Sequence, residues 1–152
     1  MRLADKLEKF MEESNKIEGE NILNPQDYTV AQTAYIDGFL NLDEVTKIHG
    51  QLTNHLNAEW SGKWRKVNVR VGNFIAPDWF DVPELMNEYW AKFDDMNSWE
   101  AHNEFEKIHP FLDFNGRMGR LIWLSKAVKE GYNFSIPFLQ KYYYQTLDKT
   151  NE

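Results

Sequence analysis

Residues 109–120 read His-Pro-Phe-Leu-Asp-Phe-Asn-Gly-Arg-Met-Gly-Arg, a turn-rich segment between two strongly helical patterns. The proline disfavours the α region for His109, so the preceding helix is expected to end there. A new helix that begins at or just after Gly116 would present unpaired backbone N–H groups and the positive end of its dipole to the loop. The segment therefore predicts an anion-binding turn between two helices.

Four side chains in this segment add chemistry to the predicted anion site. Arg117 and Arg120 lie three residues apart, on one helical face, where forked guanidinium groups can hold phosphate oxygens. Asp113 is an oxygen ligand of the kind that Mg²⁺ takes beside substrate phosphates. His109 can take a proton from an attacking hydroxyl. Each residue alone has an ordinary alternative as a dipole partner, a cap or a solvated charge, but their combination favours phosphoryl chemistry.

Apolar residues at helical spacing extend outward on both sides of this segment. Upstream, Asn97 and Glu100 resemble a helix start, and the helix is expected to run to His109. Downstream, two helices are expected over residues 117–130 and 136–147, separated by Gly131.

The first half of the chain shows the same helical periodicity, followed by one interruption. Helices are expected over residues 2–14, from Pro25 with Asn24 as its cap, over 41–57 and over 85–93. Residues 66–75 instead alternate apolar and polar side chains up to Gly72-Asn73, a dipeptide typical of hairpin turns. The fold class is therefore mostly α, a single domain with one short β-hairpin inserted in its middle.

Length and composition bound the kind of protein. The 152 residues, 42% of them hydrophobic, suit one domain over residues 1–152. The absence of cysteine excludes thiol catalysis, zinc thiolate sites and disulfides. A net charge of −7 argues against a protein that binds nucleic acid. The first residues form neither a signal peptide nor a membrane anchor, so a cytoplasmic protein without membrane contact is expected.

Segment 109–120 resembles the signature of the Fic family, His-Pro-Phe-x-Asp/Glu-Gly-Asn-Gly-Arg-x-x-Arg. Fic proteins are mostly AMP transferases, so the resemblance implies transfer of AMP from Mg-ATP to a Ser, Thr or Tyr hydroxyl of a protein target, including self-modification. It implies His109 as general base, Asp113 as the Mg²⁺ ligand and a phosphate cradle formed by Asn115, Gly116 and the surrounding backbone amides. It also implies nucleotide binding by Arg117, Gly119 and Arg120. The donor could also be another nucleotide.

One position departs from this pattern, because Phe114 stands where the family usually has glycine. If the backbone there requires a positive φ, phenylalanine is strained and the cradle is altered. Core packing is the preferred interpretation of its ring, ahead of a place in the nucleotide pocket. Phe111 is expected to anchor the loop in the core.

A second segment, Ser14-Asn15-Lys16-Ile17-Glu18-Gly19, resembles the family's inhibitory pattern Ser/Thr-x-x-x-Glu-Gly/Asn. The resemblance implies that residues 1–19 form an inhibitory helix in which Ser14, Glu18 and Gly19 carry the motif. Glu18 would pair with Arg120 and block the place of the γ-phosphate. In some relatives the corresponding glutamate positions a water that removes AMP from the target, so de-AMPylation is a further hypothesis.

The hairpin, over residues 64–76, is similar to the family's target-docking flap. An exposed strand edge can register an extended target segment through main-chain hydrogen bonds. The residues expected to do so are Val69, Arg70, Val71, Gly72 and Asn73. The alternative is a hairpin that only caps the core.

Three other functional interpretations were weighed against AMP transfer. The strongest is a catalytically silent or toxin-type nucleotide-binding interaction module, kept shut by Phe114 and Glu18. A carboxylate-bridged metal enzyme is suggested by Glu106-x-x-His109, but no second Glu-x-x-His occurs in the chain. Direct nucleic-acid binding is disfavoured by the charge. By analogy with self-inhibited relatives, a weak homodimer is expected.

Overall fold

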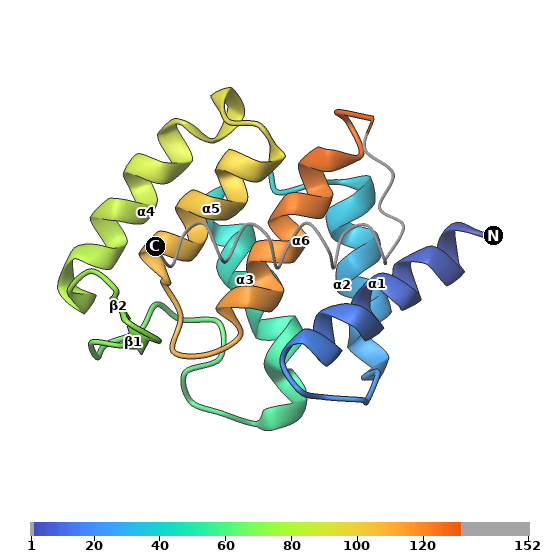
Figure 1. The fold of residues 1–152 in the computed structure, drawn as a ribbon, viewed down its shortest axis with the longest axis horizontal. Coiled ribbons are helices and arrows are strands. Elements are labelled where there is room, and N and C mark those ends of the chain that lie inside the picture. The colour runs from blue at the N-terminus through green and yellow to red at the C-terminus, as the bar shows by residue number, and fades with distance from the viewer. Residues whose placement is uncertain (1, 132–152) are drawn as a thin grey trace.

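The computed structural model describes residues 2–131, and this part of the chain is helical apart from one small hairpin (Figure 1). Its α-helices are α1 (Leu3–Ile17), α2 (Pro25–Ile36), α3 (Leu42–Thr53), α4 (Val82–Ala91), α5 (Ser98–Ile108) and α6 (Asn115–Ala127). Short 3₁₀ turns occupy η1 (Asn54–Leu56), η2 (Trp79–Asp81) and η3 (Phe93–Asp95). The mostly α fold predicted from the sequence is confirmed.

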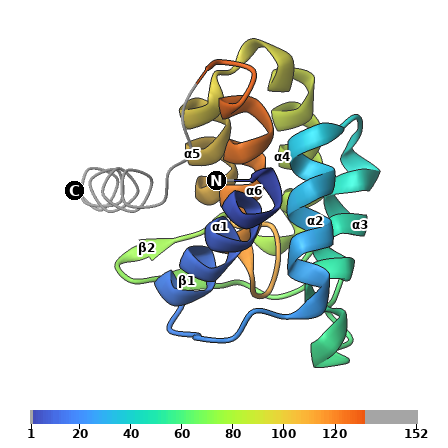
Figure 2. The ribbon, with the colours of Figure 1, turned by 90° about the vertical axis from the view of Figure 1, so that its right-hand side faces the viewer.

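Helix α6 lies at the centre of the bundle, with α5 beside it, α2 on its other side and α1 crossing near its N-terminal end (Figures 1 and 2). All of its residues except Gly116 and Lys126 are buried. A helix that is enclosed on every side belongs to the core rather than to the surface. The buried hydrophobic residues that α6 contributes are Met118, Leu121, Ile122, Trp123, Leu124 and Ala127. Because the candidate site lies at the N-terminus of this helix, the core holds it in place.

Most helix ends agree with the sequence, and the exceptions have local causes. Asn97 and Glu100 form the predicted capping box at the start of α5. Helix α1 continues to Ile17 rather than ending at Ser14, so its last turn carries the first residues of the segment that resembles the inhibitory pattern. Helix α4 starts before Pro83, which occupies its first turn, where proline needs no N–H partner. The helix expected over residues 136–147 lies outside the described residues.

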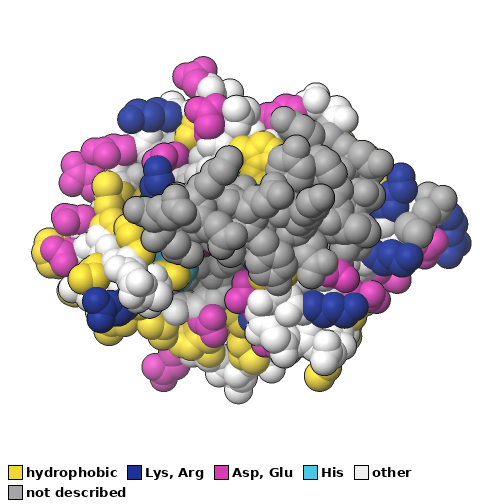
Figure 3. All heavy atoms as spheres, viewed as in Figure 1, with side chains coloured by type: hydrophobic (Ala, Val, Ile, Leu, Met, Phe, Trp, Pro, Cys, Tyr) yellow, Lys and Arg dark blue, Asp and Glu magenta, His cyan; other side chains and the backbone are white. Residues whose placement is uncertain are grey.

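The hairpin pairs β1 (Arg70–Val71) with β2 (Phe74–Ile75), antiparallel, around the predicted Gly72-Asn73 turn. Its strands are shorter than the expected segment 66–75. Just before β1, the Val69 carbonyl oxygen accepts a backbone hydrogen bond from the Ala76 N–H at 3.3 Å, and the Asn68 side chain accepts one from the Trp79 N–H at 2.8 Å. Exposed hydrophobic side chains gather on this side of the molecule, at the lower left of Figure 3.

None of the helices within residues 2–131 is both long enough and apolar enough to cross a membrane.

Two glycines with positive φ provide a matched test of the packing between α3 and the following loop. A Cβ on Gly62 (φ +74°) would lie 3.3 Å from the Thr46 carbonyl oxygen and 3.4 Å from the Gly50 Cα, whereas a Cβ on Gly72 (φ +60°) would meet open space. Each alanine substitution should lower the free energy of unfolding by roughly 1–2 kcal/mol, because alanine is strained in the left-handed conformation. In chemical unfolding, Gly62→Ala should lose more stability than Gly72→Ala, because its Cβ also meets the backbone of α3. Equal losses of stability would contradict the close packing of Gly62 on α3.

Candidate active site

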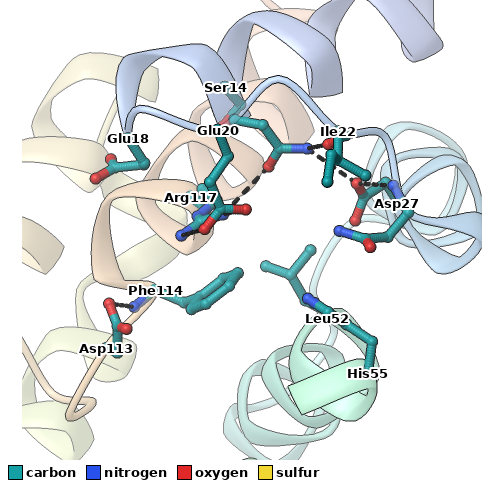
Figure 4. Close-up of polar contacts among 12 residues, drawn as sticks. Ser14, Glu18, Glu20, Ile22, Asp27, Leu52, His55, Asp113, Phe114 and Arg117 are labelled. Atoms are coloured by element: carbon teal, nitrogen blue, oxygen red, sulfur yellow. Dashed lines mark hydrogen bonds and ion pairs between the residues drawn. The ribbon is translucent and has the colours of Figure 1, made fainter.

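The candidate site lies where the C-terminal end of α5, the loop 109–114 and the N-terminal end of α6 meet the last turn of α1 (Figure 4). His109 ends α5, as predicted from Pro110, and has a left-handed backbone with φ +51°. Its N–H still donates to the Phe105 carbonyl oxygen at 3.0 Å. The imidazole is therefore carried on a sharp turn at the end of a rigid helix.

The loop after His109 is held by Phe111 and Asn115. Phe111 is fully buried and stacks on the His49 ring with 3.7 Å between ring centroids, which confirms its expected role as the core anchor. The Asn115 side chain accepts from the Phe111 N–H and donates to the Phe111 carbonyl oxygen, both at 2.8 Å. The Asn115 amide thus closes the loop on itself.

His49 fixes the position of Asp113 through the main chain. Its Nδ1 accepts a hydrogen bond from the Gly62 N–H at 3.0 Å, so the neutral ring carries its proton on Nε2 and donates it to the Asp113 carbonyl oxygen at 3.0 Å. Burial lowers the pKa of His49 to about 4, which keeps the ring neutral. The sequence analysis missed this residue, although a histidine within the apolar stripe of residues 41–57 was a visible signal.

The Asp113 side chain is exposed at the edge of the site, and one of its oxygens accepts a hydrogen bond from the Phe114 N–H at 2.8 Å. This bond orients the carboxylate and leaves its other oxygen free to bind a metal ion. A single oriented carboxylate suits Mg²⁺, which usually binds one or two carboxylates together with water and substrate phosphates. The residues present therefore fit a magnesium ion that arrives with a nucleotide.

Helix α6 begins at Asn115, one residue earlier than expected, with Phe114 as its N-cap. The first turn of the helix lies against a carboxylate, since a Cβ on Gly116 would lie only 2.5 Å from Glu18 Oε1. The same oxygen accepts a hydrogen bond from Arg120 Nη2 at 2.8 Å. The predicted contact between Glu18 and Arg120 is confirmed, and the glutamate lies at the positive end of the helix dipole.

The Arg120 side chain is buried, with 1% of its surface exposed. Ser14 adds two contacts: its hydroxyl accepts from Arg120 Nε at 2.7 Å, and its carbonyl oxygen accepts from Nη2 at 3.0 Å. The last turn of α1 therefore surrounds the guanidinium with oxygen acceptors, which a buried cation requires.

Arg117 is buried as well, and it has a carboxylate partner that the sequence analysis missed. Glu20 contacts both terminal nitrogens, at 3.1 Å to Nη1 and 3.3 Å to Nη2, while the Asn15 side-chain oxygen lies 3.4 Å from Nη1. The Phe114 ring lies against the Arg117 guanidinium, with 3.5 Å between the ring centroid and the guanidinium carbon (Figure 4). Both arginines of the first turns of α6 are thus held by residues 14–20, at the end of α1 and just after it.

His109 has the electrostatics of a general base. Burial is the largest effect on it and lowers its pKa, so the imidazole is neutral near pH 7 and can accept a proton. The Glu106 carboxylate lies 4.0 Å from its Nδ1, and burial raises the pKa of Glu106 to about 7. Nδ1 is buried, which leaves Nε2 as the nitrogen available to a substrate.

Residues 39–124 match the sequence model of the Fic/DOC family, a range that includes the loop and both arginines. The chain belongs to the Fic/DOC family. Among similar proteins, the protein adenylyltransferase Fic of Drosophila mojavensis is 30% identical over 95% of this chain and 30% of its own length. That of Aedes aegypti is 28% identical over 95% of this chain and 31% of its own length. The chain thus spans less than a third of these relatives.

The fold has a solved counterpart in a Fic family protein from Desulfovibrio desulfuricans G20. The two structures align with a TM-score of 0.57 over 84% of this chain and 48% of the other, at 24% sequence identity. This likeness supports the Fic arrangement of the helices around the loop.

One predicted site residue, Gly119, has a structural role beyond the one assigned to it. A Cβ on Gly119 would overlap Glu106 Oε1 and approach His102, so this glycine allows α6 to pack closely on α5. Its contribution to nucleotide binding stays a prediction. The hairpin residues Arg70 to Asn73 are exposed, and their part in target docking also stays a prediction.

Phe114 has φ +67°, the left-handed conformation that glycine adopts without strain. Its ring is buried, so Phe114→Ala should destabilise the fold by about 3–5 kcal/mol. Phe114→Gly loses the same ring but relieves the backbone, and it should be roughly 1 kcal/mol more stable than Phe114→Ala. Chemical unfolding of the two variants tests this order, and the reverse order would show that the backbone is not strained.

The neutral state of His49 predicts a dependence of stability on pH. Its folded pKa of about 4 lies below the ordinary 6.5, so the unfolded chain binds the proton more readily, and stability falls as pH falls through this window. At pH 5 the loss is about 2 kcal/mol. His49→Gln should reduce the loss of unfolding free energy between pH 7 and pH 5 by about 2 kcal/mol and leave the part that comes from His102, whose pKa burial also lowers to about 4. The exposed His55→Gln should leave the plot unchanged. A parent-like slope in His49→Gln would contradict the assignment.

Proposed function

We propose that this chain is a protein adenylyltransferase that moves AMP from Mg-ATP to the hydroxyl of a protein side chain. The observation that carries the proposal is the convergence at the start of α6 of two buried arginines, an oriented carboxylate and a neutral histidine. Such a site offers positioning and charge neutralisation, which phosphoryl transfer needs more than covalent help. The names of the similar Fic proteins add support for this activity.

In the proposed reaction, His109 Nε2 takes the proton of the target hydroxyl as its oxygen attacks the α-phosphorus of ATP. The bond between the α-phosphorus and the bridging oxygen of the β-phosphate breaks, and pyrophosphate leaves with the bonding electrons. Arg117 would neutralise the phosphates near the loop, and Arg120 would hold the γ-phosphate. Asp113 would hold Mg²⁺, which supplies charge neutralisation between the α- and β-phosphates.

The proposal includes self-inhibition by the end of α1. Glu18 lies beside Gly116 and Arg120, in the position that a γ-phosphate would use. Glu20 similarly takes up the terminal nitrogens of Arg117 that a phosphate would contact. A carboxylate and a phosphate oxygen compete for the same guanidinium donors, so ATP would bind in an unproductive pose while Glu18 stays in place. Release of AMP from a modified target, with Glu18 positioning a water, is a further part of the proposal.

Substitution of Glu18 tests the proposed activity and its inhibition together. A charge-assisted hydrogen bond contributes about 1.5–3 kcal/mol, so Glu18→Gly and Glu18→Gln should raise AMP transfer roughly tenfold or more. The readout is intact mass after incubation with Mg²⁺ and ATP, where self-modification adds one AMP. His109→Ala in the Glu18→Gly background should abolish the gain.

Glu13→Gln is the matched control, because Glu13 lies on the same helix and, within residues 2–131, forms its ion pair with Lys16, at 3.6 Å, rather than with Arg117 or Arg120. It should behave like the parent. Equal transfer by the Glu18 variants and the parent would contradict the inhibitory role. No transfer by any of them, together with ATP binding, would instead favour the silent nucleotide-binding module. AMP release from a modified target that persists in Glu18→Gly would argue against a hydrolytic role for this residue.

A further inference from the structure

Arg65 lies buried between the hairpin and the end of α5, with 3% of its surface exposed. Its guanidinium donates only to backbone carbonyl oxygens in the described part of the chain. Nε bonds His109 at 2.7 Å, Nη1 bonds Val67 at 2.9 Å, and Nη2 bonds Pro77 at 2.6 Å and Ile108 at 3.3 Å. The Arg65 N–H adds a bond to the Pro110 carbonyl oxygen at 2.9 Å.

These partners explain how a buried cation is tolerated although no carboxylate within residues 2–131 forms an ion pair with it. The last carbonyl groups of an α-helix have no partner within the helix and form the negative end of its dipole. Arg65 satisfies two of them, at Ile108 and His109, at the end of α5. Burial lowers the pKa of Arg65, but arginine stays protonated in proteins, so the full set of donors remains.

The four carbonyl partners belong to two parts of the molecule that the sequence separates. Val67 and Pro77 lie on the two arms of the hairpin, before β1 and after β2, so one guanidinium closes the base of the hairpin. Ile108 and His109 belong to the turn that carries the candidate general base. In Figure 1 the hairpin lies beside this end of α5.

The carbonyl of His109 is the partner with the most direct consequence for chemistry. His109 has a left-handed backbone, which a non-glycine residue adopts only when the surroundings hold it there. The 2.7 Å bond from Arg65 Nε holds the carbonyl of this same residue. A change at Arg65 would therefore release both the backbone of His109 and the base of the hairpin.

We propose that Arg65 is a positioning residue that couples the hairpin to His109. Through this coupling the hairpin, which is expected to bind the target, and His109, the proposed general base, keep a fixed position relative to each other. The proposal rests on the proposed function for its catalytic consequence. Its structural part, the coupling of two segments through one guanidinium, stands on the hydrogen bonds alone.

Lysine cannot replace arginine in this role. Four carbonyl oxygens are reached by three nitrogens of a planar fork, whereas an ammonium group offers three donors from a single point. Arg65→Lys keeps the positive charge but should lose the simultaneous contact with both segments. Arg2→Lys, at an exposed position just before α1, is the matched control for the same chemical change.

The test compares Arg65→Lys and Arg2→Lys in the Glu18→Gly background. We expect Arg65→Lys to lower the kcat of self-modification at least tenfold while the KM for ATP changes less than twofold, because the nucleotide contacts lie on α6. Amide hydrogen exchange should rise in residues 66–77 and 108–112 together and stay unchanged in α1 to α3. Arg2→Lys should behave like its background in both measurements.

Three outcomes would overturn the proposal: kcat within twofold of the background, a parallel loss of ATP affinity with faster exchange throughout the chain, or faster exchange in the hairpin alone. The second outcome would show a merely structural role. If Glu18→Gly itself transfers no AMP, the proposed function fails, and the exchange comparison in the parent still decides the coupling. Faster exchange in both segments then supports it, and any other pattern refutes it.

Discussion

The central physical constraint in this protein is the burial of two guanidinium groups, Arg117 and Arg120, at the positive end of α6. Both the side-chain cations and the helix dipole favour negative charge at this place. In the described structure that charge comes from Glu18 and Glu20, which follow α1 into the loop before α2. The site is therefore built to hold anionic oxygens. Those of a nucleotide would have to replace the protein's own carboxylates.

This constraint explains why α1 matters to a site whose signature lies about a hundred residues later in the chain. Ser14 and Glu18 supply the oxygen acceptors that water would supply to Arg120 at a surface. Removing them would leave a cation that another anion can bind. The observed contact with Glu18 and the proposed nucleotide contact thus use the same donors. The exposed fraction of the Glu18 side chain, 35%, against 1% for Arg120, indicates which partner can leave.

The loop between α5 and α6 depends on polar groups that are satisfied by main chain rather than by opposite charge. His49 holds the Asp113 carbonyl, Asn115 holds both backbone groups of Phe111, and Arg65 holds the carbonyl of His109. Such contacts restrict the backbone of the loop while leaving the functional side chains of His109 and Asp113 available. The catalytic signature accounts for the chemistry, and these three residues account for its geometry.

Local sequence signals were sufficient for most of the fold and for part of the site. The Asn97 capping box, the proline after His109 and the Gly72-Asn73 turn depend on neighbouring residues, so their effects could be predicted from the chain. The resemblance also led to the contact between Glu18 and Arg120. The partners of Glu20, His49 and Arg65 could not be assigned in this way, because they lie far away in sequence. The sequence by itself determined the helical fold, the loop and its chemistry. Only the tertiary structure decided which groups neutralise the buried arginines and hold the loop, because those contacts form only when α1, α3 and the hairpin pack around α5 and α6.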